Sequence, residues 1–167
     1  MTQVCSPFIK KRLLRETNKS KKYKKCEVFF KNEDNYISFL EQEKDLQAKI
    51  YYDDLIIKFG LNYPFNPPKV FIKKDNEETS YIYYLSDISQ KYSTRLKKKN
   101  ILCLCCDSIL CANKWSPAFT YENIISEYID MKNMVEKMYY EDFIVEICFK
   151  NKIYCDSIID RICSFIK

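Results

Sequence analysis

Histidine is absent from this sequence of 167 residues, and glycine occurs only once, at Gly60. Without histidine there can be no Ser-His-Asp or Cys-His catalytic pair, no HExxH zinc site and no histidine-based proton switch. A single glycine excludes the glycine-rich phosphate loops of kinases, P-loop NTPases and Rossmann enzymes. Any chemistry must therefore use the side chains of cysteine, aspartate, glutamate, lysine, tyrosine or asparagine.

Long apolar segments are missing as well. No apolar run approaches the roughly 20 residues that a membrane-spanning helix needs, and the first ten residues lack the apolar core of a secretory signal peptide. The cysteines number nine, an odd count, which together with the missing signal indicates reduced thiols in a cytoplasmic, or cytoplasmic and nuclear, protein. With 47% hydrophobic and 31% charged residues, we expect a single folded domain over residues 1–167.

Positive charge is concentrated in two places. The net charge is +5, and the basic residues are concentrated in residues 10–25, where nine Lys or Arg accompany a single Glu, with a second cluster at residues 97–99. Such clusters bind nucleic acid, form a solvated helix face or dock an acidic partner. Nucleic-acid binding is the weakest of these interpretations, because the aromatic residues mostly occupy core positions instead of alternating with the basic ones. It predicts an affinity that falls steeply with salt.

Hydrophobic periodicity predicts a helix followed by an antiparallel sheet in the first half of the chain. A short amphipathic helix is expected over about residues 7–16, with Phe8, Ile9, Leu13 and Leu14 as its apolar positions. Four strand-like runs follow at residues 26–31, 35–40, 50–61 and 69–72. Turn residues at 32–35 separate the first two runs, so a four-stranded antiparallel meander is the simplest topology.

The second half of the chain is predicted to be mainly helical. Helical character is weak at residues 81–92, and Thr120 is a candidate N-cap for a long central helix. The expected apolar face of that helix consists of Ile124, Ile125, Tyr128, Ile129, Val135 and Met138. Two C-terminal helices are expected at about residues 141–150 and 155–166. Helix, antiparallel sheet and then helices is an α+β order.

Three segments between these elements are candidates for function, although two have simple structural interpretations. Residues 63–70 contain three prolines and could be a stiff, polyproline-like connector that fixes how the sheet edge leaves the core. Residues 115–118, Trp-Ser-Pro-Ala, could be an anchored turn before a helix, because a single tryptophan usually packs.

The third segment, residues 100–111, contains four cysteines at positions 103, 105, 106 and 111. One interpretation is a buried strand, because free cysteine is among the most buried residue types. A second is zinc, from the C-x2-C spacing of Cys103 and Cys106, but adjacent cysteines fit one tetrahedral ion poorly and no second knuckle or histidine is present. We therefore expect no metal and no cofactor. The third interpretation is a nucleophilic thiol.

A free thiol suits a chain without histidine. With a pKa of about 8.5, a few per cent of such a thiol is thiolate at neutral pH, enough to attack an activated thioester without a general base. Attack on an amide would need a general acid for the leaving amine, and no histidine is present to supply it. The sequence therefore favours thioester chemistry over amide hydrolysis.

Taken together, these segments resemble the ubiquitin-conjugating enzymes, which accept ubiquitin from an activating enzyme and pass it on with the help of a ligase. The basic segment Lys11–Glu16 is similar to the first helix of that family, and Ile57–Val70 is similar to its strand and proline signature. Residues 106–110, Cys-Asp-Ser-Ile-Leu, followed by residues 115–120, resemble its active-site segment and the loop before its second helix. The resemblance spans most of the chain and implies the fold of that family over residues 1–167.

The resemblance also implies an activity and a nucleophile. It implies a transferase that holds ubiquitin, or a related modifier, as a cysteine thioester before transfer to a substrate lysine or a ligase. In the family, aliphatic residues follow the nucleophile at the third and fourth positions and a tryptophan lies eight or nine residues on, which Cys106 matches with Trp115. Cys103 matches the preceding residues better but lies twelve residues before Trp115, and Cys105 fits only with an insertion. We rank them Cys106, Cys103 and then Cys105.

Partner contacts are implied in the same way. The expected partners are ubiquitin or a ubiquitin-like modifier, the activating enzyme and a ubiquitin ligase, without a membrane. The residues that would contact the activating enzyme or ligase are Arg12, Arg15, Phe65, Ser116, Pro117 and Ala118. An exposed Phe65 beside a small apolar loop is a suitable weak-binding hot spot.

One departure from the family affects the expected activity. The His-Pro-Asn tripeptide upstream of the nucleophile is missing, and Asn100 is the nearest substitute for its oxyanion-supporting asparagine. Asp107 would raise the thiol pKa slightly by charge repulsion and could orient or deprotonate an incoming lysine, or it is a solvated loop carboxylate. The alternative to an active carrier is an inactive scaffold of the same fold that binds ubiquitin or a ligase without transfer.

Overall fold

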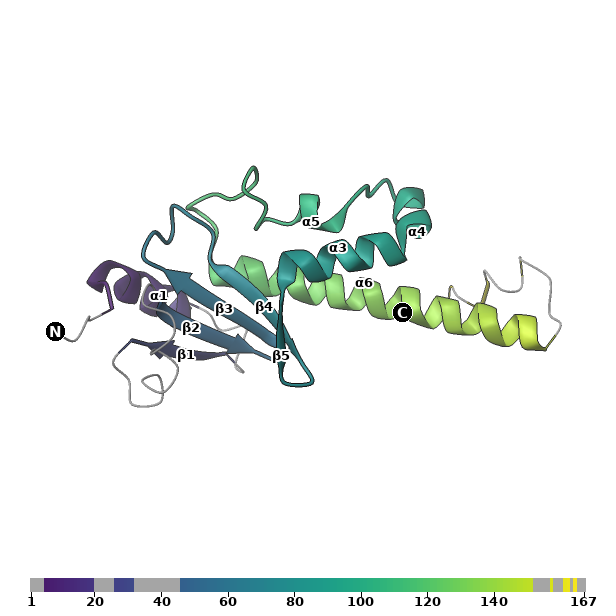
Figure 1. Cartoon of the computed structure of the whole chain (residues 1–167), viewed down its shortest axis with the longest axis horizontal. Helices are drawn as coiled ribbons and strands as arrows, with labels where there is room; N and C mark the ends of the chain where they lie inside the picture. The colour runs from purple at the N-terminus through teal and green to yellow at the C-terminus, as the bar shows by residue number, and fades with distance from the viewer. Residues whose placement is uncertain are drawn as a thin grey trace. The chain divides into compact units, whose positions relative to one another are not determined.

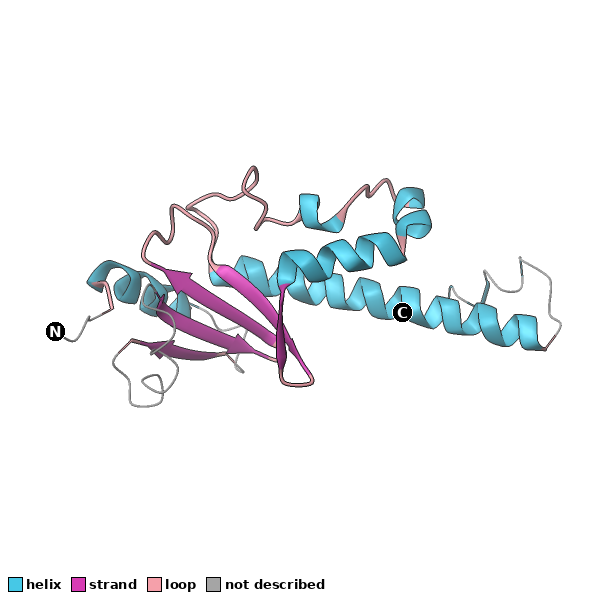
Figure 2. Ribbon diagram, viewed as in Figure 1, coloured by secondary structure: helices cyan, strands magenta, loops and turns pink. Residues whose placement is uncertain are grey.

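The computed structural model describes residues 5–19, 26–31 and 46–151, together with Ser157, Arg161, Ile162 and Ser164. The chain divides into two compact units, Met1–Glu127 and Tyr128–Lys167. The first unit combines helices with an antiparallel sheet, as Figures 1 and 2 show. The α+β class predicted from the sequence is therefore confirmed, while the single domain over residues 1–167 stays a prediction.

The sheet is an antiparallel meander in which every strand pairs with the next one along the chain. Its strands are β1 (Glu27–Phe30), β2 (Leu46–Tyr52), β3 (Leu55–Gly60), β4 (Lys69–Lys74) and β5 (Glu77–Ser80). The meander topology is confirmed, but the sheet has five strands where four were predicted. The strand expected at residues 35–40 lies outside the described residues.

The strand predicted over residues 50–61 is wrong, because that run contains a hairpin. Tyr52 of β2 pairs with Leu55 of β3, which leaves Asp53 and Asp54 as the two-residue turn. Asp53 has a φ of 52°, a left-handed conformation that aspartate tolerates better than most residues do. The turn lacks the glycine that usually marks such hairpins, so the apolar residues on either side of it were predicted as one continuous strand.

β5 was missed for a similar reason. Lys74 of β4 pairs with Glu77 of β5 across a two-residue turn of Asp75 and Asn76. Both turn residues have positive φ, 50° and 68°, which is the requirement of a type I′ hairpin turn. The strand itself is short and mostly exposed, so it lacks the alternating apolar pattern of a half-buried strand.

Helix α1 (Pro7–Lys19) is three residues longer than predicted. Its Ile9 and Leu13 are fully buried, one helical turn apart, whereas Phe8 and Leu14, which were expected on the same apolar face, are exposed. The backbone N–H of Ser6, just before the helix, donates to the side chain of Gln47 in β2 at 2.8 Å. This bond ties the start of α1 to the sheet.

Three helices lead from the sheet to the cysteine segment: α3 (Tyr81–Lys91), α4 (Ser93–Lys98) and α5 (Leu104–Asp107). The weak helix predicted at residues 81–92 is confirmed by α3, which packs against β4 and α5. Asn100 follows α4 with a φ of 59°, and its backbone N–H donates to the carbonyl of Lys97. This turn redirects the chain toward α5.

The long helix α6 (Tyr121–Lys150) begins directly after Thr120, at the predicted place. The side chain of Asn123 accepts hydrogen bonds from the backbone N–H and the hydroxyl of Thr120, at 2.8 and 3.0 Å, as the return half of a capping box does. The separate helix predicted at residues 141–150 is wrong, because α6 continues through it without a proline or glycine to end it.

The end of the chain is described only in part. The helix predicted at residues 155–166 lies outside the described residues, apart from Ser157, Arg161, Ile162 and Ser164. Among the helices that the structure describes, none combines the length and apolar character needed to cross a bilayer.

Candidate functional site

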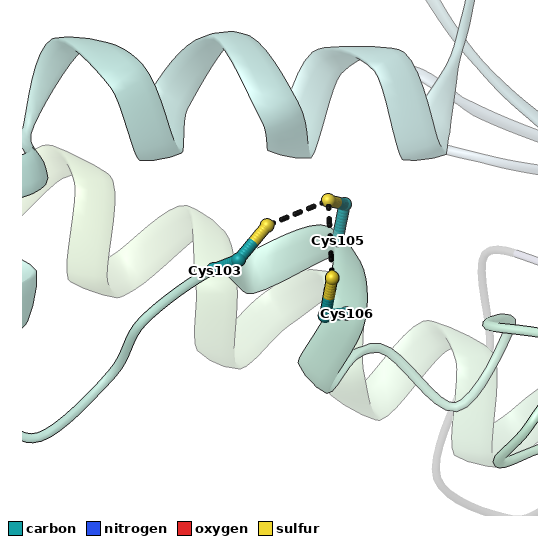
Figure 3. A group of neighbouring side chains, drawn as sticks. All are labelled: Cys103, Cys105 and Cys106. Carbon is teal, nitrogen blue, oxygen red and sulfur yellow. Dashed lines mark hydrogen bonds between the residues drawn. The ribbon is translucent and has the colours of Figure 1, made fainter.

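The sulfur atoms of Cys103, Cys105 and Cys106 converge at α5, and we call this group the thiol triad. The Sγ atoms of Cys103 and Cys105 are 2.7 Å apart, those of Cys105 and Cys106 are 4.0 Å apart, and all three lie within 4.8 Å of one another (Figure 3). Cys103 has an extended backbone and starts the single turn of α5, which brings the next two cysteines back toward it. The buried-strand interpretation of this segment is therefore wrong.

The triad is reachable from solvent although its backbone is anchored. Cys106 is exposed and the other two cysteines are partly exposed, whereas Leu104 between them is buried. The backbone N–H of Leu104 donates to the Ser89 hydroxyl at 2.9 Å, and that hydroxyl donates to the Leu85 carbonyl in α3. α3 thus fixes the start of α5 and leaves the sulfurs accessible.

Close contact between the thiols separates their acidities. Either thiol can donate in the contact between Cys103 and Cys105; with Cys105 as the donor, this bond, helped by the backbone N–H of Cys106, lowers the pKa of Cys103 to about 7. The same bond raises the pKa of Cys105 to about 12, because Cys105 must keep its proton to donate it. The pKa of Cys106 is raised as well, chiefly by its hydrogen bond with Cys103. Cys103 is therefore the most acidic thiol of the triad.

Asp107 pairs with a lysine beside the thiol triad. Its carboxylate forms an ion pair with Lys114, with Oδ1 and Nζ 2.8 Å apart, and both side chains are largely exposed. The raised pKa of Cys106 comes first from Cys103 and not from Asp107. A slight contribution of Asp107 to the thiol pKa, and its role toward an incoming lysine, both stay predictions.

A carboxylate from α6 holds the chain just after α5. Glu127 accepts a hydrogen bond from the Ser108 hydroxyl at 2.7 Å and another from the backbone N–H of Ile109 at 2.8 Å. The Ser108 side chain is buried and also accepts from the N–H of Leu110. Sequence reasoning missed both Glu127 and Ser89, which position the segment on either side of the triad.

The two proline-containing segments meet in space. The indole N–H of Trp115 donates to the Pro64 carbonyl at 2.8 Å, and the ring of Trp115 lies against those of Tyr63 and Phe119 at centroid distances of 6.3 and 5.9 Å. The Tyr63–Pro64 peptide bond is cis. The connector after β3 and the anchored turn before α6 therefore contact each other directly, although they were predicted as two separate segments.

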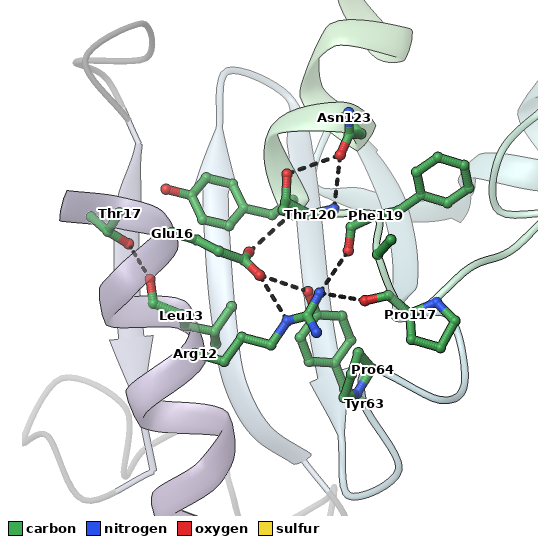
Figure 4. A network of polar contacts seen from close by, with 12 residues as sticks. Arg12, Leu13, Glu16, Thr17, Tyr63, Pro64, Pro117, Phe119, Thr120 and Asn123 are labelled. Carbon is green, nitrogen blue, oxygen red and sulfur yellow. Dashed lines mark hydrogen bonds and ion pairs between the residues drawn. The ribbon is translucent and has the colours of Figure 1, made fainter. Parts of the chain in front are cut away.

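Arg12 of α1 joins the same unit from the other side (Figure 4). Its guanidinium donates to the carbonyls of Pro117 and Phe119 at 2.7 and 2.9 Å, and its Nε lies 2.8 Å from Glu16 Oε1. It also lies over the ring of Tyr63, with Cζ 5.0 Å from the ring centroid. The guanidinium is therefore used inside the molecule, on two fixed carbonyl groups.

Glu16 is the acceptor at the centre of this network. Besides the ion pair with Arg12, its carboxylate accepts from the Tyr63 hydroxyl and from the backbone N–H of Tyr121, both at 3.4 Å. Burial raises the pKa of Glu16 despite these donors, and burial, with the adjacent carboxylate, raises the pKa of Tyr63 as well. α1, the proline segment and the start of α6 are thus held by one partly buried carboxylate.

The remaining predicted partner residues lie at the surface of this unit. Phe65 is 75% exposed, Pro117, Ala118 and Arg15 are exposed, and Ser116 is partly exposed. The hydrogen bond from Arg12 to the Pro117 carbonyl joins α1 to the loop before α6, and the bond from Trp115 to Pro64 joins that loop to the segment that carries Phe65. The thiol triad lies on α5, at the other end of the segment 107–115, and Asn100 lies in the turn after α4.

No family model, no curated protein and no solved structure matches this chain.

Proposed function

We propose that this chain is a carrier of ubiquitin, or of a ubiquitin-like modifier, that holds the modifier as a thioester on a cysteine of the thiol triad. The observation that carries the proposal is a solvent-reachable thiol cluster on an anchored turn, in a chain without histidine. Such a thiol can exchange with an existing thioester without a general base. The resemblance of residues 11–16, 57–70 and 106–120 to the ubiquitin-conjugating enzymes supports a modifier of the ubiquitin class.

The proposed reaction has two steps. First, the thiolate attacks the carbonyl carbon of the thioester between the modifier and the activating enzyme, a new C–S bond forms, and the enzyme's thiolate leaves. Second, a lysine amine attacks the new thioester, an amide forms, the carrier's thiolate leaves and the amine proton passes to solvent or to Asp107. With a ligase cysteine in place of lysine, the second step repeats the first.

Cys106 is the proposed acceptor, with Cys103 and then Cys105 as alternatives. Cys106 has the spacing to Trp115 and the greatest exposure, whereas the lowered pKa of Cys103 makes it the better nucleophile at neutral pH. For the partner surface, we propose that Arg15, Phe65 and the loop 116–118 contact the activating enzyme or ligase. Arg12 positions that loop by holding its carbonyl groups.

The test is thioester formation with purified components. The chain is incubated with an activating enzyme, Mg-ATP and ubiquitin, and an adduct that dithiothreitol removes is expected on a gel. Single Cys→Ser variants at 103, 105 and 106 then identify the site, because serine traps an oxyester that resists dithiothreitol only at the true nucleophile. Cys111→Ser is the matched control and should still form the reducible adduct.

The absence of an adduct with ubiquitin and with a panel of ubiquitin-like modifiers would refute the carrier function. The alternative, an inactive scaffold, is supported by the missing His-Pro-Asn tripeptide, since the chain has no histidine. Binding of ubiquitin or a ligase without any adduct would support that alternative.

A further inference from the structure

The thiol triad has the arrangement of a metal site. Three sulfurs of Cys103, Cys105 and Cys106 lie within 4.8 Å of one another and face a common point at the start of α5 (Figure 3). Thiolates are soft ligands that select Cu(I), zinc or iron–sulfur clusters over magnesium or calcium. We propose that the triad binds one monovalent copper ion through three thiolates.

The sulfur separations fit a three-coordinate ion. Three sulfurs placed about 2.3 Å from one ion in a plane lie about 4 Å from each other. The separation of 4.0 Å between Cys105 and Cys106 already has this value, while the 2.7 Å between Cys103 and Cys105 must widen. Loss of the proton that these two sulfurs share removes the hydrogen bond that holds them close. Small side-chain rotations then complete the site.

The choice of copper follows from the number of ligands. A structural zinc ion takes four protein ligands in a tetrahedron, whereas the chain has no histidine and, among the residues that the structure describes, the metal-ligand group at α5 consists of the three triad cysteines. The shortage of a fourth ligand, which made zinc a poor interpretation of the sequence, does not apply to Cu(I), because three thiolates complete the coordination of a Cu(I) ion. The adjacent pair Cys105–Cys106 is less strained around a planar site than around a tetrahedral one, since its wider angles keep neighbouring sulfurs further apart.

The backbone around the triad is already fixed before any ion binds. Leu104 is buried, and its N–H is held by the Ser89 hydroxyl at 2.9 Å. After α5, Glu127 holds Ser108 and Ile109. When the ion binds, the entropy cost is therefore limited to the side-chain rotations of the cysteines. The exposed Cys106 leaves an open path for the ion to enter.

The binding step balances without a redox change. Three Cu–S bonds form, the triad releases to solvent the protons that its thiols still carry, and copper stays monovalent. The inference does not depend on the proposed carrier function, because copper binding is measured without any modifier. If both are correct, they exclude each other on one molecule, since a copper-bound thiolate cannot attack a thioester.

The experiment uses the full-length chain, reduced and metal-free, under anaerobic conditions. Cu(I) is supplied from its complex with bicinchoninate, whose colour reports how much copper the protein removes. We expect one copper per chain, and X-ray absorption showing three sulfur neighbours at about 2.3 Å. Cys103→Ser, Cys105→Ser and Cys106→Ser should each weaken binding by at least about tenfold, since each removes one of the three soft ligands.

Cys111→Ser is the control, because Cys111 lies outside the triad. This variant should bind copper with unchanged affinity. If the other variants fail to fold, Cys106→Ser alone tests the copper site. Because Cys106 is exposed, this variant is expected to fold, and circular dichroism checks that it does. Unchanged copper affinity in Cys106→Ser would overturn the proposal. Loss of binding in Cys111→Ser, or stoichiometric zinc binding that copper cannot displace, would also overturn it, because either result means a four-ligand site.

Discussion

Trp115 and Pro64 are 51 positions apart in the chain and are joined by a hydrogen bond of 2.8 Å from the indole N–H to the proline carbonyl. Proline has no backbone N–H, so the backbone of Pro64 offers only its carbonyl as an acceptor, and the indole N–H satisfies that acceptor. Because the single tryptophan of the chain makes this bond, the loop before α6 takes its position from the segment after β3. The partner surface proposed above depends on that link.

Replacing Trp115 with phenylalanine should destabilise the protein. Phenylalanine keeps an aromatic ring against Tyr63 and Phe119 but leaves the partly buried Pro64 carbonyl without its donor, which costs about 1–2 kcal/mol. Urea unfolding followed by far-UV circular dichroism measures the change, because the variant has no tryptophan fluorescence. The control is Phe65→Ala, which removes a mostly exposed ring and should change the free energy of unfolding by less than about 0.5 kcal/mol.

Arg12 is expected to be irreplaceable by lysine. Its guanidinium serves Glu16 and two backbone carbonyls at once and lies over Tyr63, and a lysine ammonium cannot reproduce this planar set of donors. Arg12→Lys should lower the free energy of unfolding by about 1–3 kcal/mol.

The neighbouring Arg15 provides the matched control, because it lies on the same helix and is exposed. Arg15→Lys should leave stability within about 0.5 kcal/mol of the wild type. Equal losses from both substitutions in thermal or urea unfolding would contradict the role assigned to Arg12 in holding the loop.

The order of elements could be predicted from the sequence, whereas the turns could not. Apolar spacing places α1, the sheet and α6 because a helix and a half-buried strand have different periods. The hairpins were missed because this chain, with one glycine, uses Asp53, Asp75 and Asn76 at positive φ. Without the Asn-Gly or Asp-Gly signal, strands on either side of a turn look continuous.

The candidate site was predictable only in its local part. The spacing of the three cysteines identifies the thiols, but the residues that hold their backbone are distant in sequence. Ser89 lies 15 positions before Leu104, which it binds, and Glu127 lies 19 positions after Ser108. Such pairs depend on how α3 and α6 pack, which periodicity does not determine. The one available signal was an acidic residue, Glu127, three positions after Ile124 on the apolar face of the long helix.

The reactivity of the triad should depend on pH in a residue-specific way. Thiolate is the form that reacts with iodoacetamide, so the rate at each cysteine rises as the pH rises through its pKa. In metal-free protein, Cys103 should reach half of its maximal rate near pH 7, while Cys105 stays largely unreactive up to pH 9. Mass spectrometry of the labelled peptides measures both rates.

The cause of this difference can be tested by removing the donor. Cys105→Ala leaves Cys103 without the hydrogen bond that lowers its pKa most, so its midpoint should move upward from about 7 toward that of an unperturbed thiol. Cys111→Ala is the control and should leave the midpoint in place. A midpoint unaffected by Cys105→Ala would show that the contact between the two sulfurs does not set the acidity of Cys103.

Glu127 is expected to hold the chain after α5 in place. Glu127→Gln keeps one acceptor oxygen but replaces the other with a donor, so either the Ser108 hydroxyl or the Ile109 N–H loses its acceptor. The loss should cost about 1–2 kcal/mol and speed amide hydrogen exchange at residues 108–110. Glu136→Gln, an exposed substitution on the same helix, should change neither quantity. Faster exchange in both variants would mean that the charge of α6, and not the two hydrogen bonds of Glu127, stabilises this segment.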